Sequence, residues 1–134
     1  QAQPDHTGHK GRKVDADLDQ AVEGILITKF RNNGQSCIAA NRIYIQDQMY
    51  EPFLETFSAR VRALRVGNGL DASVDIGPLM NASAMAKCRS QVEDALAGGA
   101  RLLCGGSGHP AGPLYFEPTV LAAEVVVVGG GDSA

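Results

Sequence analysis

The sequence predicts an α/β fold in which helices cover a twisted, mainly parallel sheet. Three segments carry apolar residues at helical spacing, and three short segments rich in Ile, Leu, Val and Tyr lie between or after them. Clusters of glycine and proline separate these segments. Because strand candidates alternate with helices, crossover connections and parallel pairing are expected. The length of 134 residues fits one domain with its own core.

The first helix is predicted to begin at Leu18. Asp17 with Gln20 three residues later is a variant of the capping box, which marks a helix start. Apolar residues then recur at helical spacing, at Ala21, Val22, Ile25 and Leu26. Residues 41–46 alternate and contain Ile and Tyr, so they predict a strand.

Two further helices follow. The second has one apolar face, made of Phe53, Leu54, Phe57, Val61 and Leu64. Residues 67–78 form a loop, and the third helix then carries its own apolar face of Met85, Cys88, Val92, Ala95 and Leu96. Gly98 and Gly99 are expected to end it. Residues 101–104 and 115–121 are strand candidates on either side of a loop rich in glycine and proline.

Composition excludes several classes of function. The net charge of -3 and the pI near 5.5 argue against a nucleic-acid partner. No apolar run reaches membrane-spanning length, and residues 1–13 lack the apolar centre of a signal peptide, so a cytoplasmic location is expected. The three cysteines form no C-x-x-C pair, which favours neither disulfides nor zinc. His6 and His9 lack a third ligand, and no metal is expected.

Cys37 is the candidate nucleophile. It follows Asn33-Gly34-Gln35-Ser36 on a turn directly after the first helix, and Gly34 permits a backbone conformation that a β-carbon resists. Backbone amides around the thiol can stabilise a thiolate, or the oxyanion that forms when sulfur attacks a carbonyl. The turn therefore suits acyl or aldehyde chemistry. An unpaired cysteine can also be a small buried hydrophobe, which is the expectation for Cys88 and Cys104 in their apolar patterns.

The segment from Lys29 to Ile45, centred on Gly34-Gln35-Ser36-Cys37, resembles the nucleophile region of the NAD(P)-dependent aldehyde dehydrogenases. Four more segments resemble the family in the same order: residues 15–19, 66–71, 75–79 and 116–121. The resemblance covers residues 14–121 and implies an incomplete, aldehyde dehydrogenase catalytic-domain-like fold. Around Cys37 and along residues 69–78 it is similar to the branch that acts on succinate semialdehyde and related aliphatic aldehydes.

The resemblance implies roles for individual residues. The Cys37 thiolate attacks an aldehyde, the adduct passes hydride to a nicotinamide, and water cleaves the thioester. Ser36 and Ile38 line the aldehyde pocket by similarity, or else pack as ordinary loop residues. Lys87 matches a helix lysine that approaches the cofactor, but Ala84 replaces its usual glutamine companion, so a solvated lysine is the competing interpretation. No residue matches the general-base glutamate of the family.

Outside the resemblance, residues 1–13 are expected to be a flexible lead, and residues 122–134 a divergent strand with a glycine-rich tail. Gly129 to Ala134 reads G-x-G-x-x-A and resembles the nucleotide-binding fingerprint of flavin-dependent disulfide reductases, although an added strand with a glycine tail is favoured.

Two hypotheses about function remain. The chain is part of an oxidoreductase that converts a small aliphatic aldehyde to the acid with NAD or NADP, in which case the isolated chain is expected to bind no cofactor and to be catalytically incomplete. Alternatively, it is a non-catalytic oligomerisation or regulatory fragment of the same fold. Homo-oligomers are expected in both cases, without nucleic-acid or membrane partners.

Overall fold

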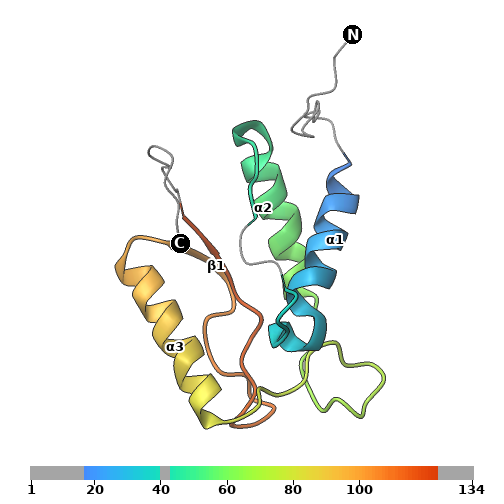
Figure 1. The fold of residues 1–134 in the computed structure, drawn as a ribbon, viewed down its shortest axis with the longest axis vertical. Coiled ribbons are helices and arrows are strands. Elements are labelled where there is room, and N and C mark those ends of the chain that lie inside the picture. Colours follow the sequence, from blue (N-terminus) through green and yellow to red (C-terminus); the bar gives the residue numbers. More distant parts are fainter. Residues whose placement is uncertain (1–16, 40–42, 124–134) are drawn as a thin grey trace.

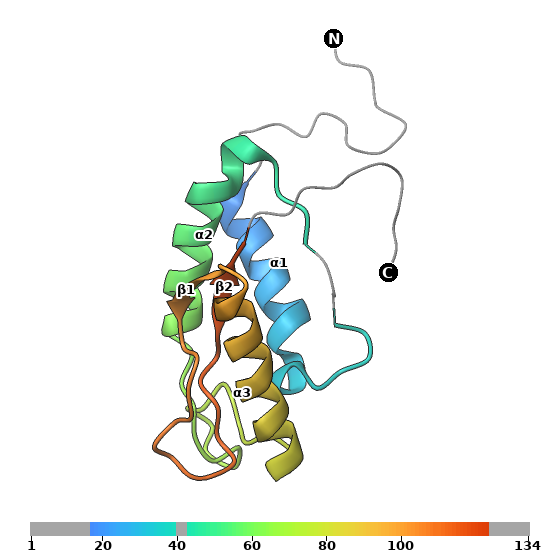
Figure 2. The ribbon, with the colours of Figure 1, turned by 90° about the vertical axis from the view of Figure 1, so that its left-hand side faces the viewer.

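The structure is a computed structural model that describes residues 17–39 and 43–123. Its elements follow in the order α1 (Leu18–Phe30), the 3-10 helix η1 (Arg31–Gly34), α2 (Asp47–Arg62), α3 (Ala82–Ala97), β1 (Arg101–Cys104) and β2 (Val120–Ala122). The two strands lie between α3 on one side and the pair α1 and α2 on the other (Figures 1 and 2).

The helix boundaries follow from local capping. The side chain of Asp17 accepts a hydrogen bond from the amide of Gln20 at 3.1 Å, which confirms the predicted start of α1. Asn81 caps α3 in the same way, because its Oδ1 accepts from the amide of Ala84 at 2.9 Å. Gly98 follows the last residue of α3 and its amide bonds back to Asp94, so the glycine pair ends this helix as predicted.

The hydrophobic core joins α1, α2 and β2. Val22 is fully buried in α1, and Val61 of α2 is 1% exposed. The predicted apolar face of α2 is confirmed, with Leu64 packed at its margin. The core cluster consists of Val22, Leu26, Phe53, Leu54, Phe57, Val61, Val120 and Ala122. One helix pair and one face of the strand pair therefore exclude water from a single core.

The prediction of a mainly parallel sheet is wrong for the part of the chain that the structure describes. β1 and β2 pair antiparallel, with Arg101 opposite Ala122 and an irregularity between Leu102 and Cys104. The physical reason lies in their connection: residues 105–119 form a loop without a helix, whereas parallel neighbours need a crossover. The described strands consequently make a two-stranded antiparallel sheet, with α3 on one side of it.

The other strand predictions fare differently. Residues 101–104 form β1 as predicted. In place of the strand expected over 115–121, the structure has the shorter β2 at Val120–Ala122, and Phe116 makes only an isolated bridge to Gly108. Residues 43–46, from the expected strand 41–46, belong to no strand, because alternation favours extended backbone but these residues have no ladder partner in the described chain. The remainder of that segment, the predicted lead and most of the predicted tail lie outside the described residues.

The loop between α2 and α3 is fixed by its own hydrogen bonds. The Asp75 carboxylate accepts from the amide of Arg65 at 2.8 Å, and the amide of Gly67 donates to the carbonyl of Ile76 at 3.0 Å. Val66 and Ile76 thereby form a short parallel bridge. The loop is thus tied to the end of α2, which holds Gly77 beside η1.

Candidate functional site

Cys37 lies on an exposed turn directly after η1. The turn runs from Ser36 to Ala39 and is closed by the amide of Ala39, which donates to the Ser36 carbonyl at 3.2 Å. The Ser36 hydroxyl accepts from the amide of Ile38 at 3.3 Å. Ile38 is 72% exposed and Ser36 half-buried. The structure therefore presents the Cys37 thiol to solvent on a turn with internal hydrogen bonds.

Three successive residues before this turn adopt the left-handed conformation. The φ angles are 55° at Asn32, 59° at Asn33 and 76° at Gly34. A β-carbon at Gly34 would lie 2.9 Å from the carbonyl oxygen of Lys29, so glycine is required there by conformation and by space. Asparagine tolerates this conformation better than most residues. The special backbone at Gly34 was predicted, but the left-handed conformation of Asn32 and Asn33 was not, although an Asn-Asn-Gly run is a signal for such a turn.

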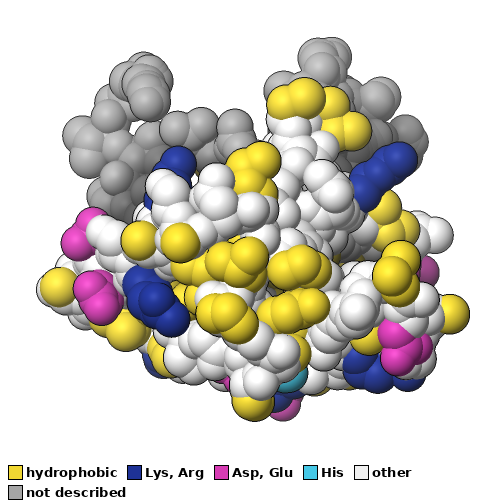
Figure 3. Space-filling model, turned by 90° about the horizontal axis from the view of Figure 1, so that it is seen from below, with side chains coloured by type: hydrophobic (Ala, Val, Ile, Leu, Met, Phe, Trp, Pro, Cys, Tyr) yellow, Lys and Arg dark blue, Asp and Glu magenta, His cyan; other side chains and the backbone are white. Residues whose placement is uncertain are grey.

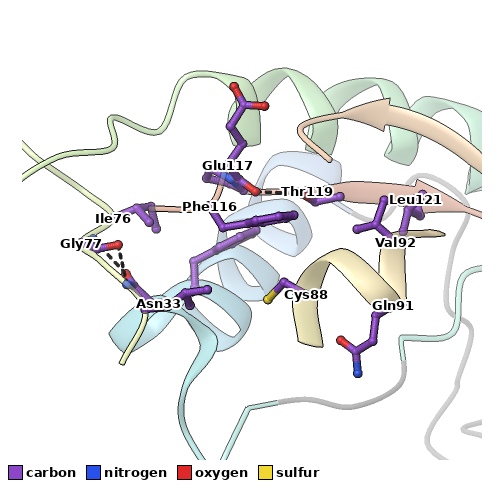
Figure 4. Close-up of a pocket in the computed structure, with 13 residues that line it drawn as sticks. Asn33, Ile76, Gly77, Cys88, Gln91, Val92, Phe116, Glu117, Thr119 and Leu121 are labelled. Carbon is purple, nitrogen blue, oxygen red and sulfur yellow. Dashed lines mark hydrogen bonds between the residues drawn. The ribbon is translucent and has the colours of Figure 1, made fainter. Parts of the chain in front are cut away.

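Asn33 connects this region to the loop after α2. Its Oδ1 accepts from the amide of Gly77 at 3.0 Å, and its Nδ2 donates to the carbonyls of Gly77 at 2.6 Å and Pro78 at 2.8 Å (Figure 4). These bonds join residues more than 40 positions apart. Sequence reasoning gave Asn33 no role, because nothing in a linear pattern shows that residues 77 and 78 lie beside it.

Gln35 makes a second connection between the same segments. Its Oε1 accepts from the amide of Met80 at 3.1 Å, while its carbonyl accepts from Nδ2 of Asn32 at 3.0 Å. Gln35 is two residues before Cys37. The segment before the turn is therefore attached at two points, Asn33 and Gln35, to the loop between α2 and α3.

A cavity of about 280 Å³ lies between α3, the strand pair and the end of α1 (Figure 4). Its walls are mostly apolar and include Phe30, Val92 and Phe116, with the side chains of Asn33 and Cys88 also facing it. Ser36, Cys37 and Ile38 are not among its lining residues. The roles of Ser36 and Ile38 in an aldehyde pocket remain predictions.

The other two thiols are less accessible than Cys37. Cys88 on α3 and Cys104 at the end of β1 are both half-buried, and all three cysteines are free. Burial raises the pKa of the Cys104 thiol above its ordinary value, because the charged thiolate loses hydration there. The chain thus has one exposed thiol and two shielded ones.

Lys87 is the predicted cofactor contact, and this role stays a prediction. Lys87 is exposed on α3, next to the half-buried Ala84, and does not line the cavity. No three metal-ligating side chains come together in residues 17–39 and 43–123. His6, His9 and the run from Gly129 to Ala134 lie outside the described residues.

None of the described helices combines the length and the apolar character needed to cross a bilayer.

Comparison with known proteins gives consistent results. The sequence pattern of the aldehyde dehydrogenase family matches residues 13–125. Succinate semialdehyde dehydrogenase of Acinetobacter baylyi is 52% identical over 108 residues, which are 81% of this chain and 22% of that protein. Glutarate-semialdehyde dehydrogenase of Pseudomonas aeruginosa is 51% identical over 107 residues, 80% of this chain and 22% of that protein.

The fold agrees with a solved relative. The crystal structure of succinate-semialdehyde dehydrogenase from Burkholderia pseudomallei superposes with a TM-score of 0.76 at 46% identity, over 79% of this chain and 22% of that one. The chain thus spans about a fifth of the length of the relatives it matches. From the match over residues 13–125 and these identities, the chain belongs to the aldehyde dehydrogenase family.

Proposed function

We propose that this chain is the nucleophile-bearing part of an NAD(P)-dependent semialdehyde dehydrogenase, with Cys37 as the nucleophile. The observation that carries the proposal is the exposed Cys37 turn, attached to the rest of the fold through Asn33 and Gln35, in a chain of this family. Because the relatives are several times longer than this chain, the activity is assigned to the whole enzyme and not to these residues alone.

The described residues can perform the first chemical step. The Cys37 sulfur forms a bond to the aldehyde carbon, the carbonyl π electrons move to oxygen, and the thiol proton leaves to solvent. The backbone amide of Cys37 has no acceptor within residues 17–39 and 43–123, so it is available to donate to the new oxyanion. Oxidation of the adduct needs NAD or NADP, which residues outside the described part would have to hold.

The proposed substrate is a small aliphatic aldehyde with an anionic group at its far end. The names of three relatives contain succinate semialdehyde, glutarate semialdehyde and 3-sulfolactaldehyde, which all share this chemistry. Succinate semialdehyde is the first candidate because it is in the name of several relatives. Ser36 and Ile38, beside Cys37 on the turn, are proposed to contact the aldehyde.

Protection of Cys37 by the aldehyde tests this function in the 134-residue chain. A thiol that has added to an aldehyde cannot be alkylated, so succinate semialdehyde should slow the reaction of Cys37 with iodoacetamide more than it slows that of Cys88. Peptide mapping after a brief treatment measures both rates in one sample, and the urea-unfolded chain gives the reactivity of unpositioned thiols. Equal protection of both cysteines in the folded chain would contradict the proposal.

A second candidate function, self-assembly or regulation of a larger enzyme, is supported by the surface. Seen from below the view of Figure 1, hydrophobic side chains gather on one face of the molecule (Figure 3). The loop between α2 and α3 carries Leu70, 94% exposed, and Met80, 75% exposed. Exposed apolar surface favours association. Sedimentation at about 50 μM tests this: association would support it, and a monomer would remove its support.

A further inference from the structure

Asn33 makes an unusual contribution to the frame of the Cys37 turn. Through its side chain alone it forms three hydrogen bonds to the backbone of Gly77 and Pro78. It lies four residues before the nucleophile, and its side chain faces the cavity between α3 and the strand pair, a cavity that Cys37 does not line (Figure 4). Asn33 therefore acts on the turn through the backbone of residues 77 and 78.

The loop that receives these bonds is itself fixed. Asp75 and Ile76 are hydrogen-bonded to Arg65 at the end of α2, and Ile76 is buried. A second bond, from the amide of Met80 to Gln35, attaches the same loop closer to the nucleophile. The segment before Cys37 is thus connected to the end of α2 through a short series of hydrogen bonds.

We propose that Asn33 is a positioning residue for Cys37, which fixes the turn so that the Cys37 amide is directed at the oxygen of the carbonyl under attack. The inference rests on the proposed function and goes beyond it, because the side-chain bonds of Asn33 go to Gly77 and Pro78 and not to the Cys37 turn. Loss of its side-chain bonds leaves the thiol present and exposed but allows the amide to move. Small displacements of a catalytic group have large effects on rate.

Two reactions of the Cys37 thiol distinguish the position of the Cys37 amide from the reactivity of the sulfur. Iodoacetamide is attacked at a saturated carbon: sulfur forms the new bond, iodide leaves with its electron pair, and no oxyanion develops. p-Nitrophenyl acetate is attacked at a carbonyl: an oxyanion forms, p-nitrophenolate leaves with the electron pair of its bond, and the thiol proton passes to solvent. Only the second reaction needs the positioned amide.

Asn33→Gly in the 134-residue chain is the test. Glycine retains the left-handed backbone at no cost, so the substitution removes only the three side-chain bonds. Asn68→Gly is the matched control, because it removes an asparagine side-chain bond, to the amide of Leu70, that involves neither the turn nor residues 77–80. We expect acylation of Cys37 to fall at least tenfold in Asn33→Gly, toward the roughly 100-fold that loss of one oxyanion donor costs, with alkylation unchanged. The control should change neither rate.

Each other outcome is decisive. Acylation of Asn33→Gly at the parent rate would overturn the inference, and so would a parent chain that acylates no faster than an unfolded one. A parallel fall in both rates would show a structural role only, and would also overturn it. If Asn33→Gly loses its helical circular dichroism, Asn33→Asp takes its place, since it keeps the acceptor for Gly77; an unchanged acylation rate there overturns the inference. Acylation that persists in Cys37→Ala would instead refute the proposed function.

Discussion

Phe53 and Phe57 stack on one another along α2, with ring centroids 5.3 Å apart and planes 14° from parallel. Both rings are buried, and they belong to the cluster that includes Val22 of α1 and Val120 of β2. The pair is therefore the point at which α2 joins the helix before Cys37 to the strand pair. The stability of the whole fold should depend on it.

Phe57→Ala should destabilise the chain by about 3–5 kcal/mol, because it removes a large buried ring and leaves a cavity in the core. Urea unfolding followed by circular dichroism measures the change. Tyr44→Ala is the control, since Tyr44 is 83% exposed and its loss should cost less than about 0.5 kcal/mol. Similar losses in both variants would show that the core is not the one described.

Replacement by alanine should have opposite effects on the stability of the fold at Gly105 and at Gly24. Gly105 has a φ of +75°, and a β-carbon there would lie 2.2 Å from the carbonyl oxygen of Pro118, so Gly105→Ala should destabilise by about 2 kcal/mol or more. Gly24 lies within α1 with nothing within 4 Å of an added β-carbon, and Gly24→Ala should stabilise by about 0.5–1 kcal/mol. Thermal unfolding of the two variants checks both signs. A tolerated alanine at 105 would contradict the described approach of this turn to Pro118.

The three thiols should be alkylated in a fixed order. Cys37 should react with iodoacetamide first, since it is exposed, while Cys88 and Cys104 are half-buried. Because burial raises the pKa of Cys104, its alkylation rate should continue to rise with pH above the ordinary value of 9.0, where the rate in the urea-unfolded chain levels off. Peptide mapping over a series of pH values gives both results. Faster labelling of Cys88 or Cys104 than of Cys37 would contradict the described burial.

The raised pKa of Cys104 also determines whether the free energy of unfolding rises or falls at alkaline pH. Between the pKa of the unfolded thiol and the higher pKa of the folded one, the native state holds more protons than the unfolded state. Stability from this group is present in full below the unfolded value and falls as pH rises through the folded value. Cys104→Ala should remove this part of the decline in unfolding free energy above about pH 9, and an unchanged slope would show that other groups cause it.

Local features of the fold could be predicted from the sequence. Asp17 and the glycine pair at 98 and 99 act through residues within one helical turn, so their effects on α1 and α3 are visible in a linear pattern. The apolar face of α2 is equally local, and its burial follows from periodicity. These predictions needed no knowledge of which segments meet.

The features that depend on long-range contacts could not be predicted in this way. The sheet was expected to be parallel because helices and strands alternate, but the loop between β1 and β2 contains no helix and leads back antiparallel. That loop was visible in the sequence and should have outweighed the general pattern. The link from Asn33 to Gly77 had no comparable signal, because only the folded chain brings these residues together.

Turnover by a chimera tests the identity of the nucleophile most directly. Residues 14–121 of this chain replace the matching segment of the Acinetobacter baylyi enzyme, which is 52% identical over 108 residues, and the absorbance of reduced nicotinamide is followed with succinate semialdehyde. The chimera should turn over, Cys37→Ala should lower its kcat at least about 1000-fold, and Cys88→Ala should retain most of the rate. Sustained turnover by a folded Cys37→Ala chimera would contradict the assignment of Cys37 as the nucleophile.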